Sequence, residues 1–173
     1  MPEHDLIKWR IEKLTPGQDR TLFDCGKQPL NDFIQKYASQ NQRLGVSQTY
    51  VAIRPGANRI EGYYAISSGA VLFATLPDET RKGLPRYPIP VAHIGRLAVE
   101  KAAQGKGLGR VLLLDAMERI LQAADFIGIH AIEVWAKDDD AKRFYVKYGF
   151  VPLMDDQFHL YMSIKTVGKL GLL

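Results

Sequence analysis

The chain has 173 residues, of which 46% are hydrophobic, and a formal net charge of +4, a composition typical of one globular domain. This composition excludes an intrinsically disordered chain and, because Cys25 is the only cysteine, a disulfide scaffold. No apolar run reaches the ~18 residues of a membrane span, and Met1–Arg10 lacks the apolar core of a signal peptide. We therefore predict a single domain over residues 1–173 in a reducing cytoplasm.

The first third of the chain predicts a strand, a helix and a hairpin. Residues 9–14 alternate apolar and polar side chains, as a half-buried strand does. Apolar residues at helical spacing follow Pro29, which suits a first helical turn, and the helix should end before Gly45. A strand over Thr49–Ile53, a turn over residues 55–58 and a strand from Arg59 onward complete the segment.

The rest of the chain predicts alternating strands and helices. Four prolines in Thr75–Pro90 leave room only for a short helix, over Asp78–Lys82. The further predicted elements are a strand over Val91–Val99, a helix over Leu108–Phe126, a strand over Ala131–Ala136, a helix over Asp138–Tyr148 and a strand over His159–Val167. The order predicts an α/β (α+β) domain with a mixed sheet.

A glycine-rich turn lies between the central strand and the long helix. Gly105, Gly107 and Gly109 leave a row of backbone amides open at a helix N-terminus, an arrangement that binds phosphate. A Walker A loop would need Gly-Lys-Ser/Thr, which is absent, and the dinucleotide fingerprint would need glycine where Arg110 stands. A third pattern, Q/R-x-x-G-x-G/A, matches Gln104–Gly109 at every fixed position.

That third pattern is the signature of the GNAT superfamily of acyl-CoA-dependent N-acetyltransferases, which this chain resembles. A second signature of the family, A-x-x-F-Y-x-x-x-G-F, matches Ala141–Phe150 without a gap. The resemblance implies a mixed, mainly antiparallel central sheet with a splayed central strand and flanking helices. It also implies acetyl-CoA as cosubstrate and no metal. The coenzyme-binding positions carried over are Leu97, Ala98 and Val99 on the splayed strand, Gln104, Gly105, Lys106, Gly107, Leu108, Gly109 and Arg110 at the pyrophosphate, and Phe144 in the core.

The same resemblance assigns the general-acid role to Tyr145. A phenol with a pKa near 10 stays protonated at neutral pH and can protonate a departing thiolate. Tyr148, three residues later, is expected to be structural. No general base stands out, and Glu100 is interpreted as a solvated turn residue rather than a base. Without a base, an α-amino group is a better acceptor than a lysine, because more of it is neutral at pH 7.

The remaining reactive side chains receive structural interpretations. His93 and His130 occupy strand positions and are expected to be core histidines, and the four histidines have no metal-ligand spacing. A covalent acetyl-Cys25 intermediate is conceivable, but direct transfer is preferred.

A longer stretch of the chain, from about Trp9 to Ser163, resembles one subgroup of the superfamily. The residues concerned include Phe23–Gly26, Leu30–Ile34, Gly62–Tyr64 and Ser67–Gly69. The subgroup comprises the tRNA-acetylating toxins of bacterial type II toxin–antitoxin systems. The resemblance implies aminoacyl-tRNA as substrate and a ribbon-helix-helix antitoxin as partner, with operator DNA bound only through the toxin–antitoxin complex. It also implies a homodimer, for which the last strand and the apolar tail Leu170–Leu173 could supply an interface.

The positive charge is concentrated in two windows, each with a net charge of +4, at residues 27–59 and 80–99. Phosphate contacts supply most of the sequence-independent affinity for nucleic acids. The predicted tRNA-binding residues are Arg81, Lys82, Arg86, Lys36, Arg43 and Arg96. Chance clustering on a solvated surface is the alternative for the charges. For the function, the alternatives are acetylation of a small-molecule amine or protein amino group, and a non-enzymatic coenzyme A- or nucleic-acid-binding module.

Overall fold

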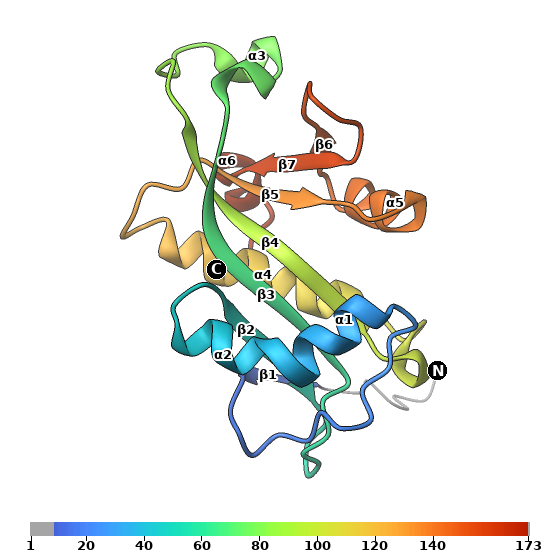
Figure 1. The fold of residues 1–173 in the computed structure, drawn as a ribbon. Coiled ribbons are helices and arrows are strands. Elements are labelled where there is room, and N and C mark those ends of the chain that lie inside the picture. Colours follow the sequence, from blue (N-terminus) through green and yellow to red (C-terminus); the bar gives the residue numbers. More distant parts are fainter. Residues whose placement is uncertain (1–8, 173) are drawn as a thin grey trace. The chain divides into compact units, whose positions relative to one another are not determined.

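The computed structural model describes residues 9–172, and its strands form one mixed sheet of seven strands (Figure 1). The order of hydrogen-bonded neighbours is β1-β2-β3-β4-β5-β7-β6. β4 and β5 are parallel, whereas β1–β2, β2–β3, β5–β7 and β6–β7 are antiparallel. The predicted mixed, mainly antiparallel sheet is therefore confirmed. The strands are β1 (Arg10–Lys13), β2 (Gln48–Ile53), β3 (Gly62–Val71), β4 (Ile89–Val99), β5 (Ala131–Trp135), β6 (Val151–Pro152) and β7 (His159–Ser163).

Helices connect most of these strands. The α-helices are α1 (Gln28–Asp32), α2 (Ala38–Arg43), α3 (Asp78–Arg81), α4 (Leu108–Ala123), α5 (Asp139–Lys147) and α6 (Ile164–Gly168). A π-helical segment, η1 (Phe33–Tyr37), joins α1 to α2, and short 3₁₀ segments, η2 (Phe73–Thr75) and η3 (Lys101–Ala103), follow β3 and β4. All four predicted helices are confirmed. They correspond to α1, η1 and α2 together (residues 28–43), α3 (78–81), α4 (108–123) and α5 (139–147).

The chain divides into two compact units, each with its own apolar core. Within the described residues, the first unit comprises 9–66 and 96–116, and the second comprises 67–95 and 117–172. The core of the first unit joins α1, η1 and the start of α2 to β2 and β3; its members include Leu30, Phe33, Ile34, Val51 and Tyr63. The Tyr63 hydroxyl donates a hydrogen bond to the Leu30 carbonyl at 2.7 Å, which fixes α1 against β3.

Gly62 allows the first turns of α4 to approach β3 and β4 closely. A Cβ atom at this position would lie 2.9 Å from Leu108 Cδ2, 3.0 Å from Leu112 Cδ1 and 3.1 Å from the Ala98 carbonyl oxygen. Leu108 and Leu112 are both buried. A glycine inside this strand therefore permits the close packing that positions the N-terminus of α4.

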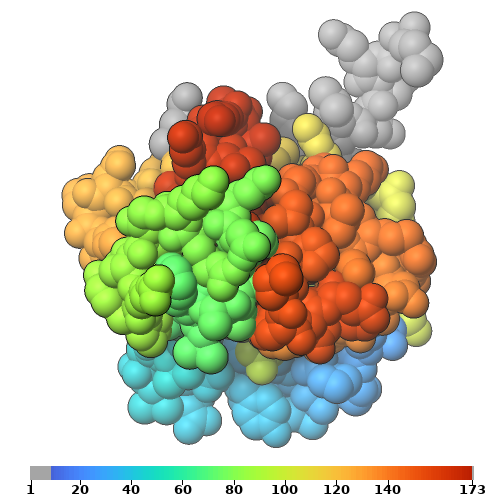
Figure 2. Space-filling view, turned by 90° about the horizontal axis from the view of Figure 1, so that it is seen from above, coloured from blue at the N-terminus to red at the C-terminus, as the bar shows by residue number. Residues whose placement is uncertain are grey.

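The second unit has a smaller core around β4, β5 and β7. Val71, Leu76, Ile89, Ala131 and Tyr161 belong to it. The Tyr161 hydroxyl lies 2.6 Å from that of Thr80 in α3, and the Met154 amide donates to the Thr75 carbonyl. The loop between β3 and β4, which contains the prolines of residues 75–90, consequently lies beside the segment 154–161 after α5, as the green and orange-red surfaces in Figure 2 show.

The last strand is shorter than the predicted His159–Val167. β7 ends at Ser163, and residues 164–168 form α6 instead of continuing the strand to Val167. The Ser163 hydroxyl accepts a hydrogen bond from the Thr166 amide and so caps the new helix. Two further boundaries are also wrong by three residues, because β3 begins at Gly62 rather than Arg59 and α4 ends at Ala123 rather than Phe126.

Some predictions lie outside the described residues. These are the absence of a signal peptide, in so far as it concerns residues 1–8, and the part of the predicted interface tail at Leu173. Within residues 9–172, no helix is long and apolar enough to cross a membrane.

Candidate active site

The glycine-rich turn presents open backbone amides at the start of α4. Gly105 and Gly107 have φ angles of 77° and 87°, and no atom lies within 4 Å of the place where a Cβ would stand on either residue. The amides of residues 105–107 donate to no other described group. The first helical hydrogen bond after them runs from the Val111 amide to the Gly107 carbonyl. The positive end of a 16-residue helix adds to this arrangement. The turn therefore fits a phosphate or pyrophosphate group.

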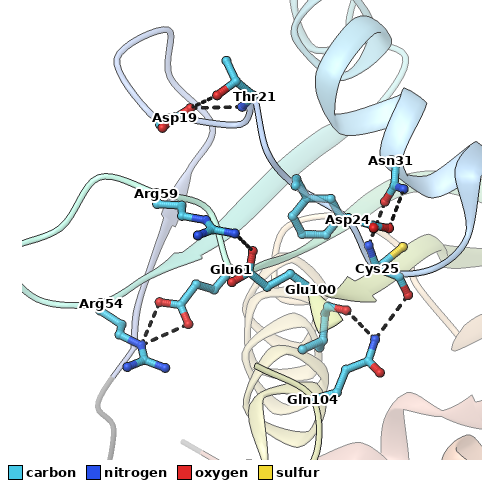
Figure 3. Close-up of polar contacts among 12 residues, drawn as sticks. Asp19, Thr21, Asp24, Cys25, Asn31, Arg54, Arg59, Glu61, Glu100 and Gln104 are labelled. Atoms are coloured by element: carbon cyan, nitrogen blue, oxygen red, sulfur yellow. Dashed lines mark hydrogen bonds and ion pairs between the residues drawn. The ribbon is translucent and has the colours of Figure 1, made fainter. Parts of the chain in front are cut away.

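Gln104 fastens the beginning of this turn. Its side-chain amide donates hydrogen bonds to the Val99 carbonyl at 2.9 Å and to the Cys25 carbonyl at 3.2 Å (Figure 3). The loop containing Cys25 is itself held by Asp24, which accepts from the Gly26 amide and from Asn31. The side chain at position 104 thus joins three segments, the end of β4, the loop before α1 and the glycine-rich turn.

The end of β4 is free of β5, as the splayed-strand prediction requires. The parallel register of β4 with β5 ends at Ile94 and Val134, although β5 continues to Trp135 in its pairing with β7. Leu97 and Val99 are half-buried, and Ala98 is buried. Residues 97–99 therefore have no strand partner on the β5 side.

Glu100 is not the solvated turn residue that the sequence predicted. Only 4% of it is exposed, its carboxylate pairs with Arg59 at 2.8 Å, and its amide donates to the Glu61 carbonyl. Glu61 is also buried and pairs with Arg54 (Figure 3). Two buried carboxylates, each with its own arginine, therefore anchor the ends of β3 and β4 where the chain turns toward the candidate site.

The other predicted coenzyme positions divide between surface and interior. Lys106, within the turn, and Arg110, in the first turn of α4, are exposed, while Leu108 is buried against Gly62. Phe144 was expected in the core, yet it is only half-buried, with its ring packed edge-on against Tyr145 and Tyr148. Tyr148 is half-buried too and holds this aromatic contact, in keeping with a structural role.

Tyr145 combines a buried ring with a hydroxyl that has no partner among the described residues. The residue is 8% exposed, and its ring makes edge-on contacts with Phe144 and Phe150. Burial raises the pKa of the Tyr145 phenol above its usual value, so the proton stays on the oxygen throughout the neutral range. Asp138 caps the helix that carries it, by accepting from the Ala141 amide at 2.8 Å.

The six predicted tRNA-binding residues differ in whether an acidic side chain of the protein already pairs with them. Arg81 is ion-paired with Asp78, and Lys36 lies 3.2 Å from Asp32. Lys82, Arg86 and Arg43 are exposed and pair with no acid among residues 9–172. Arg96 is half-buried, and its guanidinium lies 3.9 Å from the centre of the Phe33 ring. The predicted charges therefore comprise two paired and four unpaired cations.

A hollow in the first unit was not predicted. It has a volume of about 460 Å³ and is lined by Pro29, Asp32, Phe33, Tyr37, Asn41 and Arg96. The sequence did contain a signal, because Pro29, Phe33, Tyr37 and Asn41 follow one another at intervals of four residues.

Two of the histidines, the half-buried His93 and the buried His159, contact the buried Glu133. His159 Nε2 lies 2.6 Å from Glu133 Oε2, and His93 Nδ1 lies 3.0 Å from Oε1. Burial acts to raise the pKa of Glu133, but the contacts with His93 and His159 outweigh it and lower that pKa. His130, in contrast, has a buried Nε2 without a partner, and burial lowers its pKa. Across residues 9–172, no cluster of three or more His, Cys, Asp or Glu side chains could hold a metal ion.

Comparisons with known proteins identify acetyltransferases as the proteins that this chain resembles. Residues 45–152 match the acetyltransferase (GNAT) domain family. A tRNA-acetylating toxin of Mycobacterium tuberculosis is 40% identical over 158 residues, which cover 91% of this chain and 93% of that protein. The structure of AtaT complexed with acetyl-methionyl-tRNAfMet superimposes with a TM-score of 0.88 at 30% identity, covering 94% and 99% of the two chains. That of a Tyr-to-Phe mutant of KacT gives a TM-score of 0.90 at 28% identity, covering 94% and 98%.

The fold and the glycine-rich turn define an acyl-CoA-dependent acetyltransferase. The chain belongs to the GNAT acetyltransferase family. Other solved AtaT and KacT structures of similar fold contain acetyl-CoA, the C-terminus of the antitoxin AtaR, or DNA.

Proposed function

We propose that this protein is an acetyl-CoA-dependent toxin that acetylates the α-amino group of aminoacyl-tRNA and so blocks translation. The observation that carries the proposal is similarity over almost the whole chain to a tRNA-acetylating toxin, at 40% identity over 91% of its residues. A second support is the likeness to AtaT complexed with acetyl-methionyl-tRNAfMet.

In this proposal the backbone holds the cosubstrate. Acetyl-CoA supplies an acetyl group activated as a thioester. The open amides of residues 105–109, with Lys106 and Arg110, would bind its pyrophosphate, because they form a nest at a helix N-terminus. Amides of Leu97–Val99, which lie beyond the pairing of β4 with β5, would polarise the acyl oxygen. Phe144 would also belong to the coenzyme site, because it matches the second signature of the family.

Tyr145 would act as the general acid. When the neutral amine adds to the acyl carbon and the carbon–sulfur bond breaks, the sulfur needs one proton, and the amine nitrogen must lose one. The unpartnered and protonated hydroxyl of Tyr145 can give the first. Solvent takes the second and later restores the proton on the phenol. Direct transfer requires no acetylated Cys25.

The tRNA would be held by cations that the protein leaves unpaired. Lys82, Arg86 and Arg43 are exposed without acidic partners among residues 9–172 and suit phosphate contacts. Arg81 and Lys36 would contribute less, because each would first have to leave its aspartate.

The proposal also includes partners. Structures of AtaT with the C-terminus of AtaR, and of AtaT–AtaR and KacTA with DNA, support an antitoxin that brings the toxin to DNA. We expect this antitoxin to be a ribbon-helix-helix protein, and this toxin to be a cytoplasmic homodimer. Leu170, exposed after α6, is available for a dimer contact.

The proposal is tested by transfer to charged tRNA. Purified protein with labelled acetyl-CoA and a mixture of aminoacyl-tRNAs should place label on the tRNA fraction, and induced expression should arrest growth. Tyr145→Phe should abolish both effects, whereas Tyr148→Phe, at the end of the same helix, should retain them. Harmless expression together with unlabelled aminoacyl-tRNA would refute the proposal. Label on small amines or on protein instead would favour the alternative substrates.

A further inference from the structure

The hollow beside the first helix exists because of the π-helical segment. In an α-helix of 3.6 residues per turn, a step of four residues drifts by about 40° around the axis. Such a drift would carry Asn41 far from the face that holds Pro29. The wider turn of η1, in which the Ala38 amide donates to the Phe33 carbonyl five residues earlier, works against this drift. Four residues at four-residue spacing therefore line one hollow.

Of the polar side chains that line the hollow, Asp32 is bound by Gln28 and Lys36, whereas those of Arg96 and Asn41 have no polar partner within residues 9–172. The guanidinium of Arg96 lies over the buried Phe33 ring, with its central carbon 3.9 Å from the ring centre, and makes no ion pair or hydrogen bond with any other part of residues 9–172. The side-chain amide of Asn41 is also without a hydrogen bond there. Stacking on an aromatic ring fixes a guanidinium while its N–H donors remain available to an anion. The hollow is consequently prepared for a ligand with an anionic group and a polar edge.

Tyr37 supplies the third feature, an aromatic ring at the surface. It is 53% exposed, and no aromatic partner packs against it in the described structure. The charges nearby favour an anion, because Lys36 pairs with Asp32 and so leaves Arg96 as the uncompensated charge. An exposed ring, an unpaired guanidinium and a free amide together match the base, phosphate and base edge of a nucleotide.

We propose that this hollow binds the 3′-terminal nucleotide of the RNA substrate, with the base stacked on Tyr37 and read by Asn41, and the phosphate bound by Arg96. The inference rests on the proposed function and specifies which part of the RNA enters the first unit. All tRNAs end in the nucleotides C-C-A, so one subsite serves every charged tRNA.

Binding of a short, uncharged RNA tests the inference without any acetyl transfer. The probes are two fluorescent acceptor-stem hairpins, one with a C-C-A overhang and one with C-C only, measured by anisotropy at one salt concentration. The protein should bind the complete hairpin roughly fivefold or more tightly, because the shorter hairpin lacks the base that would stack on the aromatic ring. Tyr37→Ala should abolish this discrimination and Tyr37→Phe should keep it.

Matched variants separate the subsite from general effects. Gln40→Ala, exposed on the same helix, should bind both hairpins like the parent protein. Arg96→Gln should weaken binding of both hairpins, whereas Arg96→Lys should restore part of the affinity but not the planar contact. Melting temperatures of the Tyr37 variants should equal that of the parent, because the ring is at the surface.

Two results would overturn the inference. The first is equal binding of the two hairpins by the parent protein, or full discrimination by Tyr37→Ala. The second is an equal loss of kcat/KM for Tyr37→Ala on aminoacyl-tRNA and on the methyl ester of the same amino acid, since the hollow would then hold the amino acid. A protein that discriminates between the hairpins but transfers no acetyl group would instead refute the proposed function alone.

Discussion

The close approach of α4 to β3 predicts opposite effects for two glycine-to-alanine substitutions in one strand. In Gly62→Ala the new methyl group would lie 2.9 Å from a Leu108 side-chain atom and 3.1 Å from the Ala98 carbonyl. Overpacking of this kind costs about 1–3 kcal/mol, against the ~0.5–1 kcal/mol that alanine gains over glycine within a strand. The expected net loss is about 1–2 kcal/mol of unfolding free energy, or roughly 2–8 °C in Tm for a chain of this size.

Gly69→Ala is the matched control, because it lies in β3 with 3.6 Å or more to its nearest neighbours. It should melt at the temperature of the parent or slightly above. Gly62→Ala should in addition raise the KM for acetyl-CoA, since Leu108 directly follows the open turn. Thermal unfolding and steady-state kinetics measure both effects. Equal melting temperatures for the two variants would refute the packing argument.

Three further predictions concern chemistry, pH and salt. Tyr145→Phe should lower kcat by about 10²–10⁴-fold with little change in Tm, and an active variant in a single-turnover assay would exclude the general-acid role. The pKa of Glu133 is lowered in the folded state, so its contribution to stability should be present above about pH 4.3, its unfolded pKa, and should disappear as the pH falls through the folded pKa. Glu133→Gln should therefore reduce the loss of unfolding free energy at acid pH, measured by denaturant titration. An unchanged loss would show that other carboxylates cause it. The double substitution of Lys82 and Arg86 by glutamate should raise the KM for aminoacyl-tRNA. It should also reduce the slope of the logarithm of the binding constant against the logarithm of the salt concentration by roughly one for each phosphate that is no longer neutralised, and Arg81→Glu should have a smaller effect. Identical slopes for the parent and the double variant would show that Lys82 and Arg86 do not contact the tRNA.

The glycine-rich turn could be predicted because its signal is local. Gln104–Gly109 carry both the open amides and the side chain that fastens the turn, all within six residues. The long helix after the turn was likewise predictable from the apolar spacing of adjacent residues. Each of these features depends on backbone conformation that short sequence patterns determine directly.

Features that depend on distant partners were missed. Glu100 is buried because Arg59, forty-one residues away, neutralises it. The residues around position 100 contain no pattern that predicts this pair. Residues 164–168 form a helix because the Ser163 hydroxyl caps it, although the preceding apolar alternation favours a longer strand. The π-helical segment is not predictable in this way, because apolar residues at four-residue spacing also suit an ordinary α-helix, which has a similar period.

The identity of the acetylated atom tests the central claim most directly. Charged tRNA is incubated with the protein and isotopically labelled acetyl-CoA, digested to nucleosides, and the aminoacyl-adenosine is fragmented by mass spectrometry. The account predicts acetylation on the α-amino nitrogen of the amino acid, dependent on Tyr145, and none on uncharged tRNA. Unmodified aminoacyl-adenosine, with label instead on lysine side chains or small amines, would contradict it.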